Sequence, residues 1–268
     1  MAKKIEKDMF RLEGKTALVT GAGGHLGQVM AKALADAGAL VWLNGRNEKQ
    51  LAALQATIRG AGGRSELAVF DITNSQAIEK GMSQIGEHGD ALDIIVNNAY
   101  SGAAGTLDTI DLGEFGKAYE VAVTAAAGIV KQALPLLRKA GSGNASIINV
   151  SSMYGLVSPD LRVYETPQGS NPPHYGAAKA ALLQLTRYLA VEYGREGIRV
   201  NAIAPGPFPS GQVQLDDPDF VKRLEARVPL GRIGNAHELA GPVVFLASDA
   251  SSYVTGTTLV VDGGWTAW

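Results

Sequence analysis

A tyrosine and a lysine four positions apart are the side chains of this sequence best suited to chemistry. Tyr175 and Lys179 lie in "HYGAAKAALLQLTRYLAVEYG", whose pattern predicts a helix with both side chains on one face. An ammonium beside a phenol favours the phenolate, so Tyr175 could act as a general acid or base nearer neutral pH. The run "NVSS" brings Ser151 and Ser152 to the end of an apolar stretch, where a hydroxyl could hydrogen-bond a substrate carbonyl oxygen. These residues indicate proton transfer at a carbon–oxygen bond.

A glycine-rich loop near the N-terminus indicates a second site, for a phosphate group. Residues 20–27, "TGAGGHLG", follow the apolar run "TALV" and precede apolar residues at helical spacing. A loop between a strand and a helix turns backbone N–H groups and the helix dipole toward an anion, which is typical of a dinucleotide site. His25 stands where a tight phosphate turn would carry another glycine. We weigh two interpretations of it, a solvent-facing residue and a donor to the pyrophosphate or a neighbouring loop.

The end of the second predicted strand indicates which dinucleotide binds. An acidic residue there would bind the ribose 2′-hydroxyl of NAD, but this chain has Asn44, Gly45 and Arg46. A guanidinium can hold a 2′-phosphate with several donors, so NADP(H) is favoured over NAD(H), although Arg46 could also be a solvated turn residue. Asp71, in "FDIT", is placed to accept a hydrogen bond from the adenine amino group. A helix N-cap role for Asp71 or Thr73 is the alternative.

Short β-branched runs alternate with longer helical patterns throughout the chain. The predicted strands are 16–21, 40–45, 65–71, 92–98, 145–152, 198–205 and 257–264. The predicted helices lie near 26–38, 47–60, 74–88, 111–140, 174–194 and 235–248. Most strands lack alternation, which suits burial on both faces of a parallel sheet. The alternation predicts βαβ crossovers and a single α/β domain, residues 1–268, with a doubly wound sheet and helices on both faces.

Two long segments fall outside this alternation. Residues 153–173 carry four prolines, and residues 206–234 open with "GPFPSG" and contain a short helical pattern, "DPDFVKRLEARV". Both follow a strand, so both belong at the carboxyl edge of the sheet, where ligands bind in such folds. We interpret 153–173 as an active-site insertion and 206–234 as a substrate lid.

Composition narrows the classes of function. A net charge of −2 and a pI near 6.1 argue against nucleic acid or an anionic membrane as the main partner. Cysteine is absent, which excludes disulfides, thiol nucleophiles and Cys-ligated metals, and we expect no metal. The start "MAKKIEKDMF" lacks the apolar core of a secretory signal, and the apolar stretches look too short or interrupted to span a bilayer. We therefore expect a cytoplasmic protein.

The motifs together resemble those of the short-chain dehydrogenase/reductase family. The shared features are "TGAGGHLG", "NNA" at 97–99, "NVSS" at 149–152, "YGAAK" at 175–179, "IRVNAIAPG" at 198–206 and "VTGTTLVVDGG" at 254–264. They occur in the family's order and cover nearly the whole chain. The resemblance implies a seven-stranded Rossmann-like sheet with strand order 3-2-1-4-5-6-7, NAD(P)-dependent oxidation or reduction at a carbon–oxygen bond, and a homotetramer whose pairing faces are helices 111–140 and 174–194.

The resemblance also implies roles for single residues. Tyr175 would be the general acid/base, Lys179 would lower its pKa and bind the nicotinamide ribose, and Ser152 would orient the carbonyl or alcohol. Asn97 and Ala99 would line the adenosine side, and Ile203 would pack near the nicotinamide. The residues expected at the cofactor are Gly21, Gly23, Gly24, His25, Leu26, Gly27, Asn44, Arg46, Asp71, Ile72, Asn98, Ala99, Tyr175, Lys179, Pro205, Gly206 and Phe208. The residues expected at the substrate are Tyr100, Ser152, Met153, Arg162 and Tyr164.

The chain departs from the family pattern in four places. His25 replaces the middle glycine of the loop, and Tyr100 replaces the glycine that usually follows "NNA". Ala122 falls where the family's tetrad asparagine holds a water behind the lysine for proton relay. Either a shifted water path or Thr124 would replace that asparagine, or turnover is compromised. The fourth departure is the insertion between Ser152 and Tyr175, about ten residues longer than usual.

Polar side chains of the two long segments suggest a polar, hydroxylated substrate. They are Arg162, which could clamp a carboxylate or be a plain surface residue, and Tyr164, Glu165, Gln168, Gln212, Asp216 and Asp217. The insertion and the ending "DGGWTAW" resemble gluconate 5-dehydrogenase-like or sugar-modifying reductases. We expect an NADP(H)-dependent oxidoreductase acting on a sugar, sugar acid or similar compound. A 3-oxoacyl-carrier-protein reductase is the first alternative, and a non-catalytic NADP(H)-binding sensor or scaffold is the second.

Overall fold

The seven β-branched runs form one parallel sheet. The computed structural model describes residues 9–89, 91–140 and 144–268. The strands are β1 (Thr16–Val19), β2 (Leu40–Gly45), β3 (Arg64–Val69), β4 (Ile94–Asn97), β5 (Ala145–Val150), β6 (Ile198–Pro205) and β7 (Thr258–Val261). Their order is β3-β2-β1-β4-β5-β6-β7, and every pair is parallel. The predicted Rossmann-like fold and its strand order are therefore confirmed.

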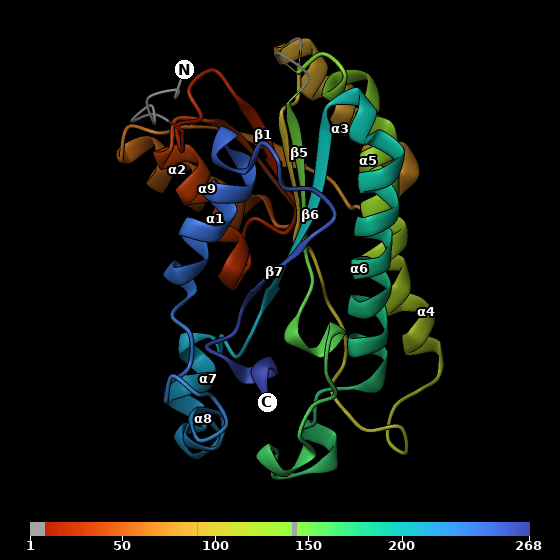
Figure 1. Cartoon of the computed structure of the whole chain (residues 1–268), viewed down its shortest axis with the longest axis vertical. Helices are drawn as coiled ribbons and strands as arrows, with labels where there is room; N and C mark the ends of the chain where they lie inside the picture. The colour runs from red at the N-terminus through yellow and green to blue at the C-terminus, as the bar shows by residue number, and fades with distance from the viewer. Residues whose placement is uncertain (1–8, 90, 141–143) are drawn as a thin grey trace.

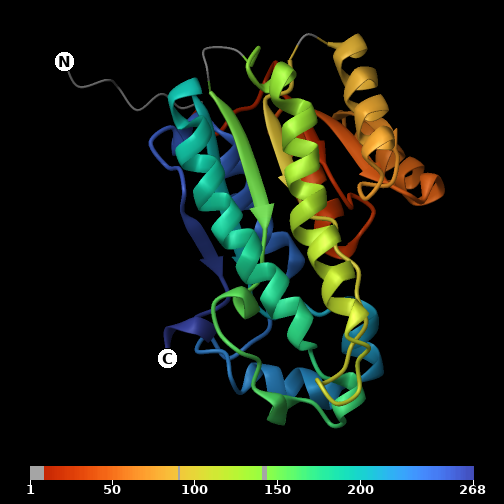
Figure 2. The same ribbon diagram turned by 90° about the vertical axis from the view of Figure 1, so that its right-hand side faces the viewer.

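Helices cover both faces of the sheet (Figures 1 and 2). On one face lie α1 (His25–Asp36), α2 (Glu48–Gly60) and α9 (Ala240–Ala247), and on the other lie α3 (Ser75–His88), α5 (Ala125–Leu137) and α6 (Pro173–Tyr193). The single helix predicted over 111–140 consists of α4 (Gly113–Tyr119), a π-helical turn η1 (Glu120–Thr124) and α5. Because π-helical turns often occur at functional sites, the position of η1 bears on the site described below.

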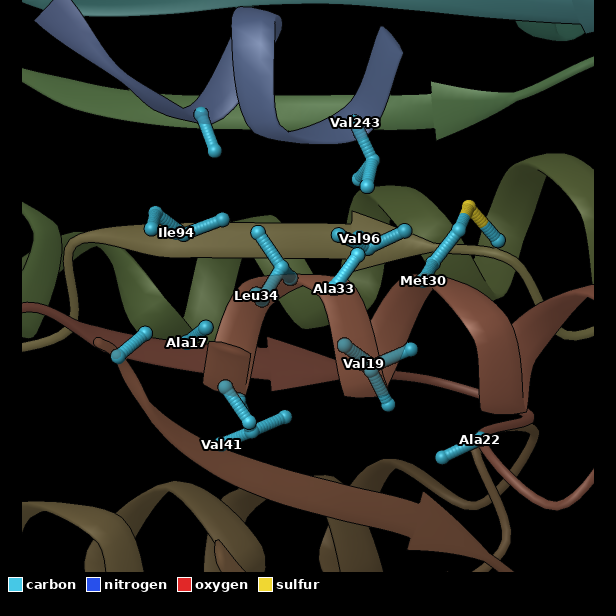
Figure 3. Packing of buried hydrophobic residues seen from close by; sticks show 14 of the residues in the cluster. Ala17, Val19, Ala22, Met30, Ala33, Leu34, Val41, Ile94, Val96 and Val243 are labelled. Carbon is cyan, nitrogen blue, oxygen red and sulfur yellow. The ribbon is translucent and has the colours of Figure 1, made fainter. Parts of the chain in front are cut away.

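The core lies between the sheet and these helices. Every residue of β5 and β6 is buried, which explains why neither strand alternates between apolar and polar residues. On the α1 face, Met30, Ala33 and Leu34 pack against Val19 and Val96 (Figure 3). Burying each large aliphatic side chain contributes roughly 1.5–3 kcal/mol, so this interface fixes α1, and with it the glycine loop, on the sheet.

Asparagine residues are the N-caps of two helices that start at the carboxyl edge of the sheet. Asn47 caps α2 by accepting a hydrogen bond from the Gln50 N–H, and Asn74 caps α3 by accepting one from the Ala77 N–H. The N-cap role considered for Asp71 or Thr73 is thus wrong. Instead, Asp71 Oδ1 accepts hydrogen bonds from the backbone N–H and the hydroxyl of Thr73, which closes the turn before α3.

The two segments at the carboxyl edge contact each other. Residues 153–173 form three short 3₁₀ turns, η3 (Met153–Gly155), η4 (Leu161–Val163) and η5 (Pro167–Gly169). Residues 206–234 carry α7 (Gly211–Asp216) and α8 (Pro218–Glu225). Arg223 on α8 donates from Nε to the Val163 carbonyl oxygen over 2.7 Å. The Tyr164 and Phe220 rings lie 5.5 Å apart.

The continuous helix Gly113–Leu137 corrects one expectation from the sequence. By length and composition alone it could cross a membrane, so the expectation that the apolar stretches are too short or interrupted does not hold for this helix. Within α5, however, the side chains of Ile129, Val130, Ala133 and Leu137 are buried in the core between α5 and the sheet. Its apolar character is what a core helix requires, and a core helix passes the same test.

Candidate functional site

Side chains from three elements meet at the carboxyl edge of the sheet. Tyr175 and Lys179 come from the first turns of α6, and Ser152 directly follows β5. They line one pocket of about 240 Å³, together with Leu26, Asn98, Tyr100, Val150, Ser151, Pro205, Gly206 and Phe208. The three predicted catalytic residues are thus brought together, and several of the predicted nicotinamide residues lie beside them. We call this the catalytic pocket.

The two serines after β5 have different partners. Ser151 donates its hydroxyl to the backbone carbonyl of Lys179 over 2.9 Å, which ties β5 to α6. Ser152 Oγ accepts the N–H of Tyr154 over 3.1 Å and hydrogen-bonds the phenol of Tyr175. Ser151 is therefore a structural link, whereas Ser152 has a hydroxyl fixed next to the tyrosine.

The phenol of Tyr175 is the central titratable group of the catalytic pocket. Burial raises its pKa above the ordinary value, and the hydrogen bond with Ser152 acts in the opposite direction. The Lys179 ammonium lies 5.7 Å from the centre of the Tyr175 ring. In the free protein burial outweighs the hydrogen bond, so Tyr175 is a phenol at neutral pH and a proton donor rather than a standing phenolate.

Lys179 is the most deeply buried cation of the site, with 3% of its surface exposed. Its Nζ donates to the Val150 carbonyl oxygen over 2.7 Å, and burial lowers its pKa to about 8. The same Nζ lies 5.0 Å from the centre of the Tyr100 ring, within the range of a cation–π contact. Lys179 thus retains its charge near neutral pH between two aromatic rings.

A larger cleft beside the catalytic pocket contains the glycine loop. Its volume is about 540 Å³, and it shares Leu26, Asn98 and Tyr100 with the catalytic pocket, so the two cavities adjoin. The other predicted cofactor residues that line it are Gly21, Gly23, Gly24, His25, Gly27, Asn44, Arg46, Asp71, Ile72 and Ala99. His25 is half-buried and begins α1. We call this the nucleotide cleft.

The glycine loop has room for backbone only. A Cβ at Gly27 would overlap the carbonyl oxygen of Gly21, and one at Gly21 would lie 2.8 Å from the Cα of Ala99. Gly21 also adopts a φ of +62°, which favours glycine. Asn98 Nδ2 donates to the carbonyl oxygens of Thr20 and Gly21 and so holds the loop against β4. The N-terminus of α1 therefore faces the nucleotide cleft at close range.

At the end of β2, Asn44 is buried and Arg46 is exposed. Asn44 is buried, and its amide donates to the carbonyl oxygens of Ala68 and Phe70, which secures β3 beside β2. Arg46 is exposed, with Nη1 3.8 Å from Asp71 Oδ2 at the rim of the nucleotide cleft. Hydrogen bonds from Thr73 hold the pKa of Asp71 below its ordinary value, with a smaller contribution from Arg46. The guanidinium thus faces the cleft, and the Asn44 amide is engaged in the sheet.

Asn97 does not lie where the sequence placed it. It was expected to line the adenosine side, but its side chain is buried behind the cleft and donates to Asn149 Oδ1 over 2.9 Å. There it lines a cavity of about 10 Å³ with Ala122 of η1 and Lys179. Thr124, considered as a replacement for the tetrad asparagine, is exposed and does not line this cavity. We call this space the lysine cavity.

A buried, aromatic-rich wall lies behind Tyr175, beside the residues that line the catalytic pocket and, apart from Tyr175, separate from them. Tyr175 packs against a buried cluster that contains Met153, Tyr154, Val163, Leu224, Val228 and Trp265, with Tyr164 and Phe220 at its edge. Of the predicted substrate residues, Met153 and Tyr164 therefore belong to this wall. Arg162 is exposed and its guanidinium binds both carboxylate oxygens of Asp160.

Sequence reasoning missed three members of this aromatic wall: Tyr154, Phe220 and Trp265. Trp265 belongs to the quoted ending "DGGWTAW", and Phe220 to the short helical pattern. Most of the polar residues that suggested a hydroxylated substrate are engaged with other side chains, as Gln212 is with Asp216. Glu165 likewise pairs with Arg223. No local pattern in the sequence shows that Tyr154, Phe220 and Trp265 pack together, because they lie in separate segments.

Comparisons with known proteins agree with this geometry. A family model described as enoyl-(acyl carrier protein) reductase matches residues 21–266. The chain is 35% identical over 259 residues to the rhamnolipid-biosynthesis 3-oxoacyl-[acyl-carrier-protein] reductase of Pseudomonas aeruginosa, covering 95% of this chain and 97% of the relative. It is 34% identical to the gluconate 5-dehydrogenase of Gluconobacter oxydans, covering 96% of each.

A solved structure with a bound cofactor shares the fold. The gluconate 5-dehydrogenase of Burkholderia cenocepacia in complex with NADP and tartrate superposes with a TM-score of 0.86 at 33% identity. The match covers 97% of this chain and 98% of that one.

Proposed function

Because the chain belongs to the short-chain dehydrogenase/reductase family of NAD(P)-dependent oxidoreductases, we propose that it interconverts a carbonyl and a secondary alcohol with NADP(H) as cofactor and Tyr175 as general acid/base. The single observation that carries this proposal is the meeting of Ser152, Tyr175 and Lys179 in a pocket that adjoins the nucleotide cleft. It also weighs against the non-catalytic sensor, which would not need this constellation.

The residues of the nucleotide cleft fit a dinucleotide. The loop is packed so closely that a Cβ at Gly27 would overlap the Gly21 carbonyl oxygen, and the α1 N-terminus that follows provides unpaired N–H groups for a pyrophosphate. The adenosine end would lie between Arg46 and Asp71, and the nicotinamide end between Tyr175, Pro205 and Gly206. A bound nicotinamide would supply or accept the hydride.

The chain's own residues would then handle the proton. The hydroxyl of Ser152 would hydrogen-bond the substrate oxygen and hold it next to the Tyr175 phenol. During reduction Tyr175 would donate its proton to that oxygen, and during oxidation the phenolate would take it back. The charge of Lys179 favours the phenolate at the moment it forms, because an ammonium stabilises a nearby anion most strongly in a buried pocket.

Arg46 supports a preference for NADP(H) over NAD(H). Its guanidinium is exposed at the rim of the nucleotide cleft, and its ion pair with Asp71 is long, 3.8 Å, so the fork of donors can turn toward a 2′-phosphate. The chain has no carboxylate at the end of β2 that would repel this phosphate, since Asn44 stands there. The NADP in the complex of the related gluconate 5-dehydrogenase is consistent with this preference.

For the substrate we propose a sugar, a sugar acid or a similar ring-sized oxo or hydroxy compound. The relatives include gluconate 5-dehydrogenase, and the catalytic pocket, of about 240 Å³, combines the hydroxyls of Ser152 and Tyr175 with the side chains of Val150 and Phe208. A 3-oxoacyl-carrier-protein reductase is the second candidate. One relative carries that name.

A cofactor-absorbance assay tests these proposals. The protein is mixed with NADPH or NADH and a panel of oxo-acids, ketoses and a β-ketoacyl thioester, and Tyr175→Phe is measured in parallel. We expect turnover with NADPH and a ketose or oxo-acid and its loss in Tyr175→Phe. Activity that survives in Tyr175→Phe would contradict the mechanism, and preference for the thioester would favour the second candidate.

We also propose that the chain forms a homotetramer through its outer helices. Around α4 and on α6 the apolar side chains Leu112, Tyr119, Tyr188 and Val191 are more than half exposed. Four such residues on adjacent helices are costly to leave in water. Light scattering of the purified protein tests this: a mass near four chains is expected, and a monomer at micromolar concentration would contradict it.

A further inference from the structure

Asn97 has a buried oxygen whose role the proposed mechanism does not explain. The residue is 6% exposed, and its amide nitrogen is used in the hydrogen bond to Asn149. Its Oδ1 is buried and has no hydrogen-bond partner among the residues that the structure describes. Leaving a buried carbonyl oxygen unpaired costs about 1–3 kcal/mol, so such an atom calls for a partner.

Lys179, which also lines the lysine cavity, has hydrogen-bond donors that need an acceptor. Its ammonium carries three donors, and the structure's described residues give it a single hydrogen bond, to the Val150 carbonyl oxygen. The rest of the ammonium group lies near the rings of Tyr100 and Tyr175 and beside the lysine cavity. A buried cation with unused donors and a buried acceptor with no partner thus line the same space.

The size of the lysine cavity fits one water molecule. Its volume of about 10 Å³ is close to the minimum that a single water needs. Ala122, in the π-helical turn, contributes only a methyl group to the wall, so this small side chain leaves the space open. Buried waters persist where they meet two or more polar groups, and here Asn97 and Lys179 supply them.

We propose that Asn97 is a positioning residue for Lys179, acting through one water that bridges Asn97 Oδ1 and Lys179 Nζ in the lysine cavity. The bridge gives the buried ammonium a second hydrogen bond and so keeps it charged. This inference deepens the proposed function and rests on it for its catalytic meaning. The bridge itself is a property of the free protein.

The surroundings of Lys179 make its pKa a clean readout of this bridge. The titratable groups that face it are the phenols of Tyr175 on α6 and of Tyr100 after β4. The lining contributed by β1, β4, β5 and η1 carries no charged side chain. Burial lowers the pKa of Lys179 to about 8, and each hydrogen bond to the charged form raises it.

The experiment measures the pKa of Lys179 by NMR on protein labelled with ¹³C-lysine, which requires no turnover. Asn97→Ala removes the acceptor, and Ala122→Val fills the cavity while the Asn97–Asn149 hydrogen bond is retained. We expect each variant to lower the pKa of Lys179 by about one unit, because a hydrogen bond to a charged group contributes about the free energy that corresponds to one pKa unit. In a variant that turns over substrate, the pH at which kcat declines on the alkaline side should shift downward together with the pKa of Lys179.

Asn149→Ala is the matched control, because it breaks the same Asn97 hydrogen bond from the other side and leaves the Asn97 oxygen in place. We expect it to lower the melting temperature and leave the pKa of Lys179 unchanged. A high-resolution crystal structure should show one water within hydrogen-bond distance of both atoms. A dry cavity, or an unchanged pKa of Lys179 in Ala122→Val, would overturn the proposal whether or not the proposed reaction is found.

Discussion

The ring of Tyr100 meets the ring of Tyr175 edge-on, with the ring centres 4.9 Å apart and the planes at 76°. Tyr100 lines both the catalytic pocket and the nucleotide cleft, so this pair stands where the two cavities join. Its hydroxyl is buried without a hydrogen-bond partner in the described residues, and burial raises its pKa to about 12. A residue that the family pattern gives as glycine is here a neutral phenol beside the acid/base.

Tyr100→Phe should therefore stabilise the free protein. Removing a buried hydroxyl that has no partner relieves a desolvation penalty of about 1 kcal/mol, while the edge-on ring contact is kept. The free energy of unfolding from urea titration measures this. Tyr188→Phe, at a position 63% exposed, is the control and should change stability by less than roughly 0.5 kcal/mol. A loss of stability in Tyr100→Phe would mean that the hydroxyl has a partner in solution.

The pKa of Lys179 predicts a pH-dependent stability difference. The group titrates near 8 in the folded protein and near 10.5 in the unfolded chain. Below pH 8 both states hold the proton and the folded state bears the buried charge. Between about pH 8 and 10.5 only the unfolded chain holds it, so folding stability rises with pH through this window.

Lys179→Met should remove that rise. We expect the stability of the variant relative to the wild type to fall by about 3 kcal/mol between pH 7 and pH 10.5, because only the wild type gains from losing the charge. Denaturant titrations at several pH values measure how the stability difference between variant and wild type changes with pH. The variant also leaves the Val150 carbonyl unpaired, but this cost does not vary with pH and so does not contribute to the change. A difference that stays flat with pH would contradict a lowered pKa for Lys179.

The sequence predicted the strands, the helices and their order better than it predicted the side-chain contacts between distant segments. Buried, non-alternating runs such as β6 identify central strands of a parallel sheet locally, and the family motifs supply their order. The placement of Ser152 and Lys179 followed because both belong to motifs tied to strand and helix ends. Which serine faces the pocket did not follow, since it depends on a hydrogen bond between Ser151 and a carbonyl 28 positions away.

The substrate side was harder for the same physical reason. Polar residues such as Glu165 and Asp216 looked available in the sequence, but partners in other turns or on neighbouring helical positions occupy them. The aromatic wall of Tyr154, Phe220 and Trp265 forms only when segments up to about a hundred residues apart pack together. Asn97 was misplaced because adjacent strand residues point to opposite faces, and a motif does not state which one faces the ligand.

Arg46 should control cofactor choice. In Arg46→Ala we expect the KM for NADPH to rise about tenfold or more while the KM for NADH stays within about twofold, because only NADPH carries the 2′-phosphate that the guanidinium would bind. Steady-state kinetics with each cofactor measure this. Arg64→Ala, which removes an exposed arginine on β3 that donates to the Gly38 carbonyl, is the control and should change neither. Equal losses for both cofactors would contradict the assignment.

Arg223 joins the two long segments, residues 153–173 and 206–234, at the carboxyl edge of the sheet. Its Nε donates to the Val163 carbonyl, and its guanidinium pairs with Glu165 over 3.3 Å and with Asp217 over 3.8 Å. Arg223→Ala would leave that carbonyl unpaired and free α8 from residues 160–165, which lie beside the aromatic wall. We expect the KM of the carbonyl substrate to rise roughly three- to tenfold and proteolytic cleavage within 153–173 to become faster, because both report the order of this segment.

Lys222→Ala separates this effect from a general loss of charge on α8. Lys222 neighbours Arg223, is exposed, and pairs only with Asp219 one turn away among the described residues. Water screens an exposed pair of this kind, so kinetics and cleavage should stay close to the wild type. If Arg223→Ala behaved like Lys222→Ala, the two segments would be held by the Tyr164–Phe220 contact rather than by the arginine, and Phe220→Ala would then produce the faster cleavage.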